Sequence, residues 1–269
     1  MKSSTSNKFE VYLSDAAGRY QDPDALLHSG LASYDVTLTA FVSCYNEEEF
    51  IVQTLDDIYT ALRVAVPSFE IIVIDDGSRD QSISLVKSYI EQHPQENIIL
   101  RCNLVNRGLA QNFIDGAFLG KGEYYKLFCG DNPEPPESII TVCKLAGQAD
   151  IIIPNYNNIE GKHGFRLWLS NTYTALVNCV SGNSIRYYNG LHLHRRQNIM
   201  RWHSNTNGFG FQADIICILL KQGATYLEVS VPNNHRSGSQ ALTWKNLFSV
   251  ANILSDILLR RIGGTIFGQ

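Results

Sequence analysis

Apolar residues recur along the first half of the chain with two alternating spacings. A nearly continuous apolar run such as residues 70–75 is typical of a strand buried on both faces of a parallel sheet, whereas apolar residues three or four apart, as in residues 47–64, indicate an amphipathic helix. These patterns predict strands over 36–44, 70–75, 97–102, 124–128 and 150–154, and helices over 47–64, 80–92, 109–119 and 137–145. Such alternation predicts an α/β fold with a mostly parallel sheet flanked by helices.

The pattern changes after residue 154. A polar loop is followed by predicted helices over 165–180, 209–221 and 242–262, a strand over 225–231 and ambiguous pieces over 184–201. We therefore expect an N-terminal leader segment over 1–35, one domain over 36–240 with halves 36–154 and 155–240, and a C-terminal amphipathic helix over 241–269. Because residues 1–35 are polar and contain Asp22-Pro23-Asp24, we expect the leader to lie on the surface rather than to form a domain.

Composition excludes several classes of protein. Of 269 residues, 44% are apolar and 18% are charged, and 22 Lys+Arg against 26 Asp+Glu give a net charge of −4. Disorder needs few apolar residues and a high net charge, and a nucleic-acid partner favours a basic surface, so neither is expected.

Six cysteines without a Cys-x-x-Cys pair favour free or buried thiols over zinc ligands or disulfides. With no signal peptide and no run of about eighteen apolar residues, a soluble, cytoplasmic protein is expected, and membrane association remains open.

Polar and acidic residues follow three of the predicted strands. Ligands of open parallel sheets bind at the carboxyl ends of the strands, where these residues lie. The adjacent acids Asp75 and Asp76 end a very apolar strand and are costly unless they are paired, hydrogen-bonded or ligand-bound. They could accept hydrogen bonds from a nucleobase or a ribose; the alternative is a turn in which Ser78 or Asp80 caps the next helix. Asp131 follows strand 124–128 and could hold a divalent cation on a diphosphate, or could belong to a proline-rich turn.

Four motifs in this order resemble the family 2 glycosyltransferases of the GT-A fold. They are Tyr45-Asn46-Glu47, Asp75-Asp76-Gly77-Ser78, Asn106-Arg107-Gly108 and Asp131…Pro135-Pro136-Glu137. The set is most similar to that of the dolichyl- and polyprenyl-phosphate sugar synthases, and the segments 208–214 and 235–240 resemble later elements of that subgroup. The resemblance implies a GT-A fold, with a Rossmann-like, mostly parallel sheet flanked by helices and a mixed C-terminal half.

The resemblance also implies roles for individual residues. It assigns donor-nucleotide contacts to Ser43, Tyr45, Glu47, Asp75, Asp76, Asn106 and Gly108. Asp131 matches the second acid of the family's Asp-x-Asp pair and would hold Mg²⁺ or Mn²⁺ on the diphosphate, while Arg236 and Ser239 match a loop near the diphosphate and the acceptor. Cys129 stands where the first acid of the pair is expected, so the cation would lose a ligand, for which Glu134 or His235 could substitute.

The implied reaction moves a sugar from a UDP- or GDP-sugar to a polyprenyl phosphate or a glycan hydroxyl, with inversion. Asp131, Asp214 and Arg236 are the catalytic candidates. An ionised phosphate needs no base, whereas an alcohol needs a carboxylate within hydrogen-bond reach; Asp214 is the candidate, and a surface acid of a helix is the alternative. The rival class is a non-catalytic sugar-nucleotide-binding or scaffolding protein, suggested by Cys129 and by Pro133.

Two further features have two interpretations each. His192 and His194 would share one face of a strand, and without a third ligand at a recognisable spacing we expect two exposed strand residues rather than a metal site. The helix Leu242–Ile262 has an apolar stripe and could lie on a membrane surface near a lipid acceptor. Because its polar face has few cations before Arg260, we favour packing on the domain or on a second subunit in a homodimer.

Overall fold

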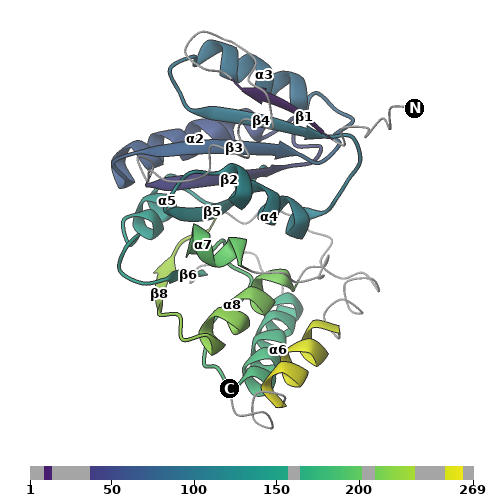
Figure 1. Cartoon of the computed structure of the whole chain (residues 1–269), viewed down its shortest axis with the longest axis vertical. Coiled ribbons are helices and arrows are strands. Elements are labelled where there is room, and N and C mark those ends of the chain that lie inside the picture. The colour runs from purple at the N-terminus through teal and green to yellow at the C-terminus, as the bar shows by residue number, and fades with distance from the viewer. Residues whose placement is uncertain (1–8, 14–36, 157–163, 202–209, 234–251, 263–269) are drawn as a thin grey trace, which may run out of the picture. The chain divides into compact units, whose positions relative to one another are not determined.

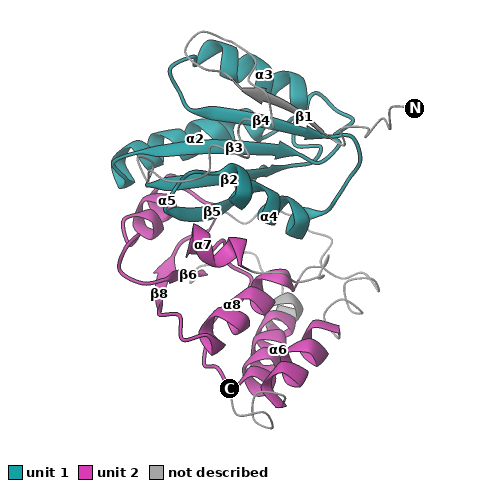
Figure 2. Ribbon diagram, in the orientation of Figure 1, with its two compact units in different colours: residues 1–132 teal, residues 133–269 magenta. Residues whose placement is uncertain are grey.

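The computed structural model describes residues 9–13, 37–156, 164–201, 210–233 and 252–262 (Figure 1). The chain forms two compact units, Met1–Asn132 and Pro133–Gln269 (Figure 2). The boundary lies earlier than the division at residue 154 between the two predicted halves. The predicted strand over 150–154 therefore belongs to the second unit.

The first unit contains a largely parallel sheet. Its strands are β1 (Phe9–Leu13), β2 (Leu38–Cys44), β3 (Phe69–Asp75), β4 (Ile98–Asn103) and β5 (Tyr124–Cys129), in the order β1-β4-β3-β2-β5. Strands β2 to β5 are parallel to their neighbours, whereas β1 is antiparallel to β4. The sequence did not predict β1, which lies within the segment expected to be a leader; the rest of residues 1–35 lies outside the described residues.

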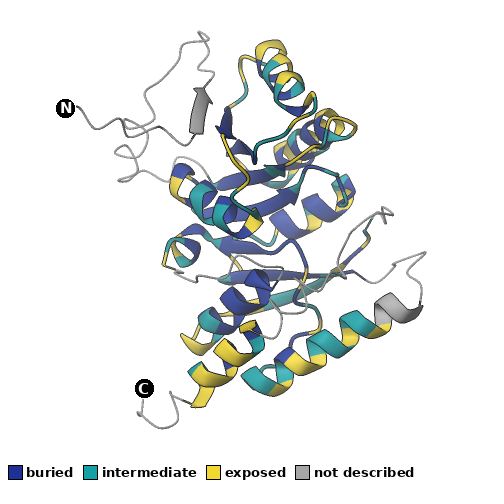
Figure 3. Cartoon of the chain, turned by 90° about the vertical axis from the view of Figure 1, so that its right-hand side faces the viewer, coloured by how far each residue is buried: buried dark blue, intermediate teal, exposed yellow. Residues whose placement is uncertain are grey.

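Three helices of the first unit connect and cover these strands. They are α2 (Ile51–Ala65), α3 (Ser82–Gln92) and α4 (Leu109–Leu119). Helix α4 packs on β2 and β3, α3 packs on β4, and α2 contacts α3. The apolar run of β3 is buried, as its sequence predicts (Figure 3). The ring of Phe113 in α4 contacts the rings of Phe41 and Tyr125 from the sheet. These contacts form the core that holds the carboxyl ends of the strands in place.

The second unit is a mixed α/β structure. It contains α5 (Pro136–Cys143), β6 (Ile151–Tyr156), α6 (Gly164–Ser181), β7 (Leu193–Arg195), α7 (Arg196–Met200), α8 (Phe211–Lys221) and β8 (Tyr226–Val231), with a further helix over 252–262. Strand β6 is antiparallel to β7 and parallel to β8. This mixture of directions confirms the predicted mixed C-terminal half, and it resolves the ambiguous residues 184–201 into a short strand and a short helix.

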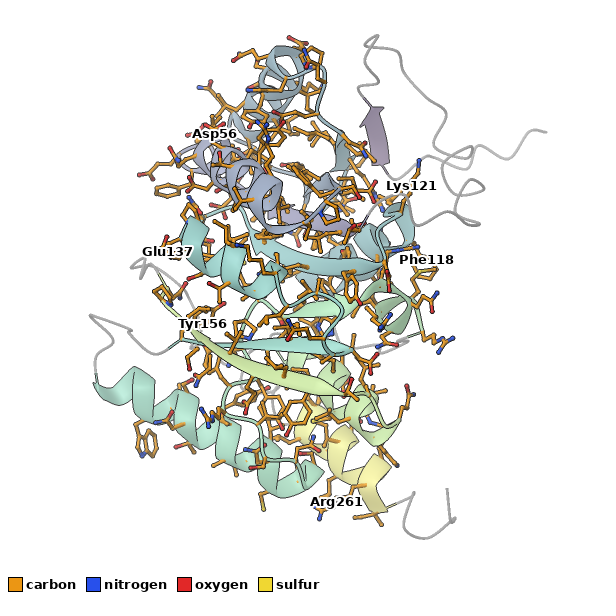
Figure 4. The ribbon with its side chains drawn as sticks, turned by 90° about the vertical axis from the view of Figure 1, so that its left-hand side faces the viewer. Asp56, Phe118, Lys121, Glu137, Tyr156 and Arg261 are labelled. Atoms are coloured by element: carbon orange, nitrogen blue, oxygen red, sulfur yellow. The ribbon has the colours of Figure 1, made fainter. Side chains whose placement is uncertain are left out.

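The described part of the C-terminal helix, residues 252–262, packs within the second unit. Ile253 and Ile257 are buried, and the guanidinium of Arg261 donates to the carbonyl of Cys179 at 2.8 Å (Figure 4). Arg260 forms an ion pair with Asp214 of α8. These contacts agree with the packing alternative for this segment. In the part of the chain that the structure describes, no helix is long and apolar enough to cross a membrane.

All six cysteines are free thiols, as predicted from their spacing. Cys44, Cys102, Cys143 and Cys217 are buried, whereas Cys179 is exposed.

Asp150 links the three strands that the structure describes in the second unit. Its replacement gives a prediction that depends on pH. Its carboxylate accepts the amide and the hydroxyl of Thr225, each at 2.8 Å, and the guanidinium of Arg195 at 2.9 Å. The backbone hydrogen bond from Thr225 holds the pKa of Asp150 below its usual 3.8. A lowered pKa in the folded state stabilises the protein above the unfolded value, and this stabilisation is lost as the pH falls through the folded value. Asp150→Asn should therefore cost about 1 kcal/mol at pH 7.

Denaturant unfolding of both proteins between pH 7 and pH 3 checks this prediction. The difference between wild type and Asp150→Asn should shrink below the usual pKa of 3.8. A difference that stays constant across this range would show that the charge of Asp150 does not contribute.

Candidate active site

The carboxyl ends of three adjacent strands meet at one edge of the first unit's sheet. In the register of the sheet, Cys44 of β2 pairs with Asp75 of β3, and Ser43 of β2 pairs with Cys129 of β5. The motifs that follow these strands are therefore neighbours, as the sequence predicts. Six of the predicted site residues lie at this edge or in the turns that leave it: Ser43, Tyr45, Glu47, Asp75, Asp76 and Asp131.

Five hydrogen bonds join the segment after β2 to the segment after β3. They run from the Asn46 amide to Ser78 Oγ, from the Arg79 amide to Asn46 Oδ1, from the Glu47 amide to Ser82 Oγ, from the Glu48 amide to Asp80 Oδ2 and from the Gln81 amide to Glu48 Oε2. Asn46 adopts a positive φ of 57° within this arrangement. The two segments thus form one connected rim, from which the Tyr45 side chain projects with 46% of its surface exposed.

These contacts correct the expected helix cap. Helix α3 begins at Ser82, two residues later than the predicted start at residue 80. Ser78 does not cap the helix, because its hydroxyl accepts the amide of Asn46 instead. Asp80 does contact the helix start, since its Oδ1 accepts the amide of Ser82 at 3.0 Å. The physical reason is that residues 78–82 satisfy the amides of the neighbouring segment before the helix begins.

Asp75 is fully buried and only partly satisfied. Its Oδ2 accepts the amides of Gly77 at 3.1 Å and Ser78 at 2.9 Å, in a turn that Gly77 permits with its positive φ of 81°. Within the described chain no group donates a hydrogen bond to Oδ1. Burial, together with the charge of Asp75, raises the pKa of the neighbouring Cys44 thiol. An unsatisfied, buried carboxylate oxygen is costly, and this cost is removed when a ligand donates to the atom.

Asp76 holds the loop that follows β4. Its Oδ1 accepts the side-chain amide of Asn103 at 2.9 Å and the backbone amide of Arg107 at 2.8 Å, and its Oδ2 accepts the amide of Gly108 at 2.9 Å. These bonds bring the Asn106-Arg107-Gly108 motif to the same edge as the acids. A carboxylate has about four acceptor positions, so one position remains for a ligand.

The end of β5 approaches β2 closely. The Gly130 amide donates to the Ser43 carbonyl at 2.9 Å, and the Thr54 hydroxyl donates to the Gly130 carbonyl at 2.8 Å. Gly130 thus lies against Ser43 and Glu47, and the next residue, Asp131, is half-buried. The next residue, Asn132, has a positive φ of 51° and donates to Asp57 at 2.6 Å, which fixes the turn behind Asp131.

Gly130 has no room for a side chain, which gives a testable prediction. A Cβ at this position would lie 2.7 Å from the Ser43 carbonyl oxygen and 2.9 Å from Glu47 Cγ. Gly130→Ala should push β5 away from β2 and destabilise the protein by about 1–3 kcal/mol, because the backbone cannot give way easily. Chemical denaturation measures this loss. Gly223→Ala serves as a comparison for backbone strain without a clash, since its φ of 84° is strained for alanine while its Cβ would meet nothing within 4 Å. Equal stability of Gly130→Ala and wild type would contradict this packing.

The residues at the end of β5 are compatible with a divalent cation held together with a substrate. Among the described residues no group of three or more His, Cys, Asp or Glu side chains is arranged as a complete metal site. Mg²⁺ and similar ions, however, are commonly held by one or two carboxylates together with substrate phosphates. Asp131 is such a carboxylate. Glu134, an expected substitute ligand, is buried and accepts a hydrogen bond from Tyr156 at 3.2 Å, and His235 lies outside the described residues.

Asp214 lies in the second unit and is not a surface acid. Its side chain, in the first turn of α8, is fully buried and is paired with Arg260. Within the described residues its Oδ2 has no hydrogen-bond partner. The two other candidates of this half, Arg236 and Ser239, lie outside the described residues.

The expectation that His192 and His194 are exposed is wrong. Both side chains are only 1% exposed, and their rings lie 5.9 Å apart. His192 Nδ1 is 2.6 Å from Gln212 Oε1 of α8. His192 therefore has a polar partner inside the unit, on α8, instead of facing water.

Three residues near this edge were not predicted from the sequence: Asn103, Asn112 and Asp115. Asn103 Nδ2 donates to both Asp76 and Asn112, and Asp115 accepts the guanidinium groups of Arg101 and Arg107. The available signal was a polar residue at the last position of a buried strand. Of these residues, Asn103 lines a pocket of about 410 Å³, whose other lining residues are Gly77, Ser78, Arg79, Ile83, Lys87, Cys102 and Leu104.

A family model described as "Glycosyl transferase family 2" matches residues 39–212, more than half of the chain. The chain belongs to glycosyl transferase family 2. The match covers all three strand ends and Asp131, so the resemblance read from the motifs is confirmed.

Two relatives indicate which members of the family this chain resembles. A dolichyl-phosphate β-glucosyltransferase of Dictyostelium discoideum is 33% identical over 44% of this chain and 37% of its own. An undecaprenyl-phosphate 4-deoxy-4-formamido-L-arabinose transferase of Photorhabdus laumondii is 27% identical over 56% of this chain and 46% of its own. The chain thus spans less than half the length of these relatives, and it is akin to polyprenyl-phosphate sugar synthases within the family.

Solved structures confirm the fold. Glucosyl-3-phosphoglycerate synthase from Mycobacterium tuberculosis, in complex with Mn²⁺, UDP and phosphoglyceric acid, superposes with a TM-score of 0.61 over 93% of this chain and 86% of its own, at 14% identity. At this identity the likeness shows the fold alone, and it is the predicted GT-A fold.

Proposed function

We propose that this family 2 glycosyltransferase moves a sugar from a nucleoside-diphosphate sugar to the phosphate of a polyprenyl phosphate, with inversion at the anomeric carbon. The observation that carries the proposal is the meeting of Glu47, Asp75, Asp76 and Asp131 at the carboxyl ends of adjacent parallel strands. The names of the curated relatives support a lipid-phosphate acceptor.

The donor nucleotide would lie on the rim formed by the segments after β2 and β3, together with the loop after β4. The exposed Tyr45 ring and Asn106 are available for the nucleoside, with Ser43, Glu47 and Gly108 beside them. The buried Oδ1 of Asp75 would accept from a nucleobase N–H, and the remaining acceptor position of Asp76 would accept from a ribose hydroxyl. UDP- and GDP-sugars are the candidate donors.

Asp131 would hold Mg²⁺ or Mn²⁺ together with the diphosphate. Such a cation neutralises the charge that develops on the departing diphosphate. A thiol is a poor ligand for these hard ions, so of the two positions that match the Asp-x-Asp pair, Cys129 and Asp131, only Asp131 offers an oxygen ligand. Mn²⁺ bound with UDP in the structural relative from Mycobacterium tuberculosis supports this assignment. Arg236 and Ser239 would complete the contacts to the diphosphate and the acceptor.

The acceptor class determines whether a base is needed. A phosphate monoester is already ionised near pH 7, so it attacks the sugar without proton removal. A glycan hydroxyl would need a carboxylate, and Asp214 remains the candidate for that case. The pairing of Asp214 with Arg260, and its complete burial, favour the phosphate acceptor, which requires no exposed carboxylate. A lipid acceptor would bring the protein to a membrane surface from the cytoplasmic side.

Titration calorimetry with UDP, GDP, UDP-glucose and GDP-mannose, each with and without Mn²⁺, tests the donor part of the proposal. We expect one nucleotide to bind more tightly when Mn²⁺ is present.

Cys129 in place of the usual acid is the observation that favours a second candidate, a sugar-nucleotide-binding protein without activity. Tight binding with neither hydrolysis nor transfer would support that candidate, whereas absence of binding to the whole panel would overturn both.

A further inference from the structure

A network of charged side chains joins strand β4 and the loop Asn106–Gly108 to helix α4. Asp115, in the middle of α4, accepts the guanidinium of Arg101 at 2.8 Å and that of Arg107, both through Oδ2. Its Oδ1 accepts the side-chain amide of Gln111 at 2.7 Å. One carboxylate therefore connects a buried arginine of β4 with an arginine of the rim loop.

The two arginines differ in burial. Arg101 is buried, and burial lowers its pKa, which the charge of Asp115 partly offsets. Arg107 is more open, with 27% of its side chain exposed. A buried cation requires a nearby carboxylate to remain charged. Arg101 alone would therefore explain why an acid lies at position 115, but it does not explain why Arg107 shares the same oxygen.

Arg107 is fixed from two directions. Its backbone amide donates to Asp76, one of the two acids at the end of β3, while its side chain is held by Asp115 of α4. The following residue, Gly108, also donates to Asp76 and directly precedes the first residue of α4. The loop Asn106–Gly108 is thus held between Asp76, a candidate nucleotide-binding acid, and Asp115 of helix α4.

We infer that Asp115 is a positioning residue for the donor site, which holds Arg107 and with it the loop Asn106–Gly108 in the conformation that binds a nucleoside diphosphate. The inference rests on the proposed function, since it names a residue that sets donor affinity without touching the donor. Ordered loops bind more tightly because less conformational entropy is lost on binding. Loss of the ion pair between Asp115 and Arg107 should therefore weaken donor binding and leave the rate of the chemical step unchanged.

The test uses Arg107→Gln as its main variant. Because this substitution leaves the Arg101–Asp115 pair in place, the fold should be retained. The dissociation constant for the nucleotide that binds wild type in the UDP and GDP panel should rise about tenfold, the effect of losing a charged hydrogen bond. In a transfer assay the donor KM should rise while kcat is unchanged, and Arg107→Lys should restore part of the affinity.

Asp115→Asn is the second variant, and the double variant Arg107→Gln/Asp115→Asn completes a cycle. If Asp115 acts through Arg107, the double variant should bind the donor no more weakly than the weaker single variant. Arg63→Gln is the matched control, an exposed arginine of α2 that lies over the Tyr59 ring. Thermal unfolding of every variant separates loss of fold from loss of affinity.

The outcomes distinguish this inference from the proposed function. Wild type that binds none of the nucleotides refutes the proposed function and the inference with it. Wild type that binds, with Arg107→Gln of equal affinity, refutes the inference alone. Asp115→Asn that lowers only the unfolding temperature, with additive effects in the cycle, would show that Asp115 serves merely to compensate the charge of Arg101.

Discussion

Asp131→Asn should reduce sugar transfer by about 100-fold or more, the loss typical of removing one group that stabilises developing charge in a transition state. The amide has nearly the shape of the carboxylate but lacks its charge, so a cation on the diphosphate would lose the acid that follows β5. The half-buried position at a strand end predicts little change in unfolding temperature. Transfer from the donor identified by calorimetry, measured over a range of Mn²⁺ concentrations, checks this result.

Glu91→Gln is the matched control for Asp131→Asn, because Glu91 is an exposed acid of α3 that lies outside the four motifs. We expect that control to transfer sugar at nearly the wild-type rate. Full activity of Asp131→Asn, with unchanged dependence on Mn²⁺, would remove Asp131 from the mechanism.

The ion pair between α8 and the C-terminal helix gives the second large effect. Arg260→Ala leaves the fully buried carboxylate of Asp214 without its cation, which should cost about 3 kcal/mol of unfolding free energy. Asp214→Asn should cost less, about 1 kcal/mol, because the Arg260 side chain is 37% exposed and can turn toward water. Urea denaturation of the two variants measures this asymmetry.

The same pair of variants addresses the acceptor. If the acceptor is a phosphate, folded Asp214→Asn should transfer sugar within about threefold of wild type, because no base is required. A loss of about 100-fold in kcat with the fold intact would instead assign Asp214 as a general base, which points to a hydroxyl acceptor. If both variants were destabilised equally, the larger loss could not be attributed to a buried Asp214 carboxylate left without its cation.

Local sequence patterns predicted much of the first unit because each feature has a local cause. The apolar run before Asp75 could belong only to a buried strand, and the acids after it could be placed at the sheet edge because parallel strands end together. Strand β1 was missed because its five residues are in a polar context, and their pairing with β4 is a long-range contact that no local pattern encodes.

The environment of single side chains was harder to predict. Asp76 was expected to face a ligand, yet the structure gives it three protein donors, since the loop after β4 folds back onto it. His192 and His194 were expected to be exposed, but both are buried, because burial of a short strand depends on tertiary packing. Spacing along the chain identifies which residues are neighbours in an element, whereas the partner that satisfies each polar atom comes from elsewhere in the chain.

The most direct test of the central claim is a transfer assay with the full chain. The protein would be incubated with a radiolabelled UDP- or GDP-sugar, Mn²⁺ and a polyprenyl phosphate, and the lipid phase would then be extracted and counted. Label should appear in the lipid phase as a sugar joined to the polyprenyl phosphate, and it should be absent with Asp131→Asn. Label that stays in the aqueous phase with a nucleotide shown to bind would contradict the account and favour a binding protein without transferase activity.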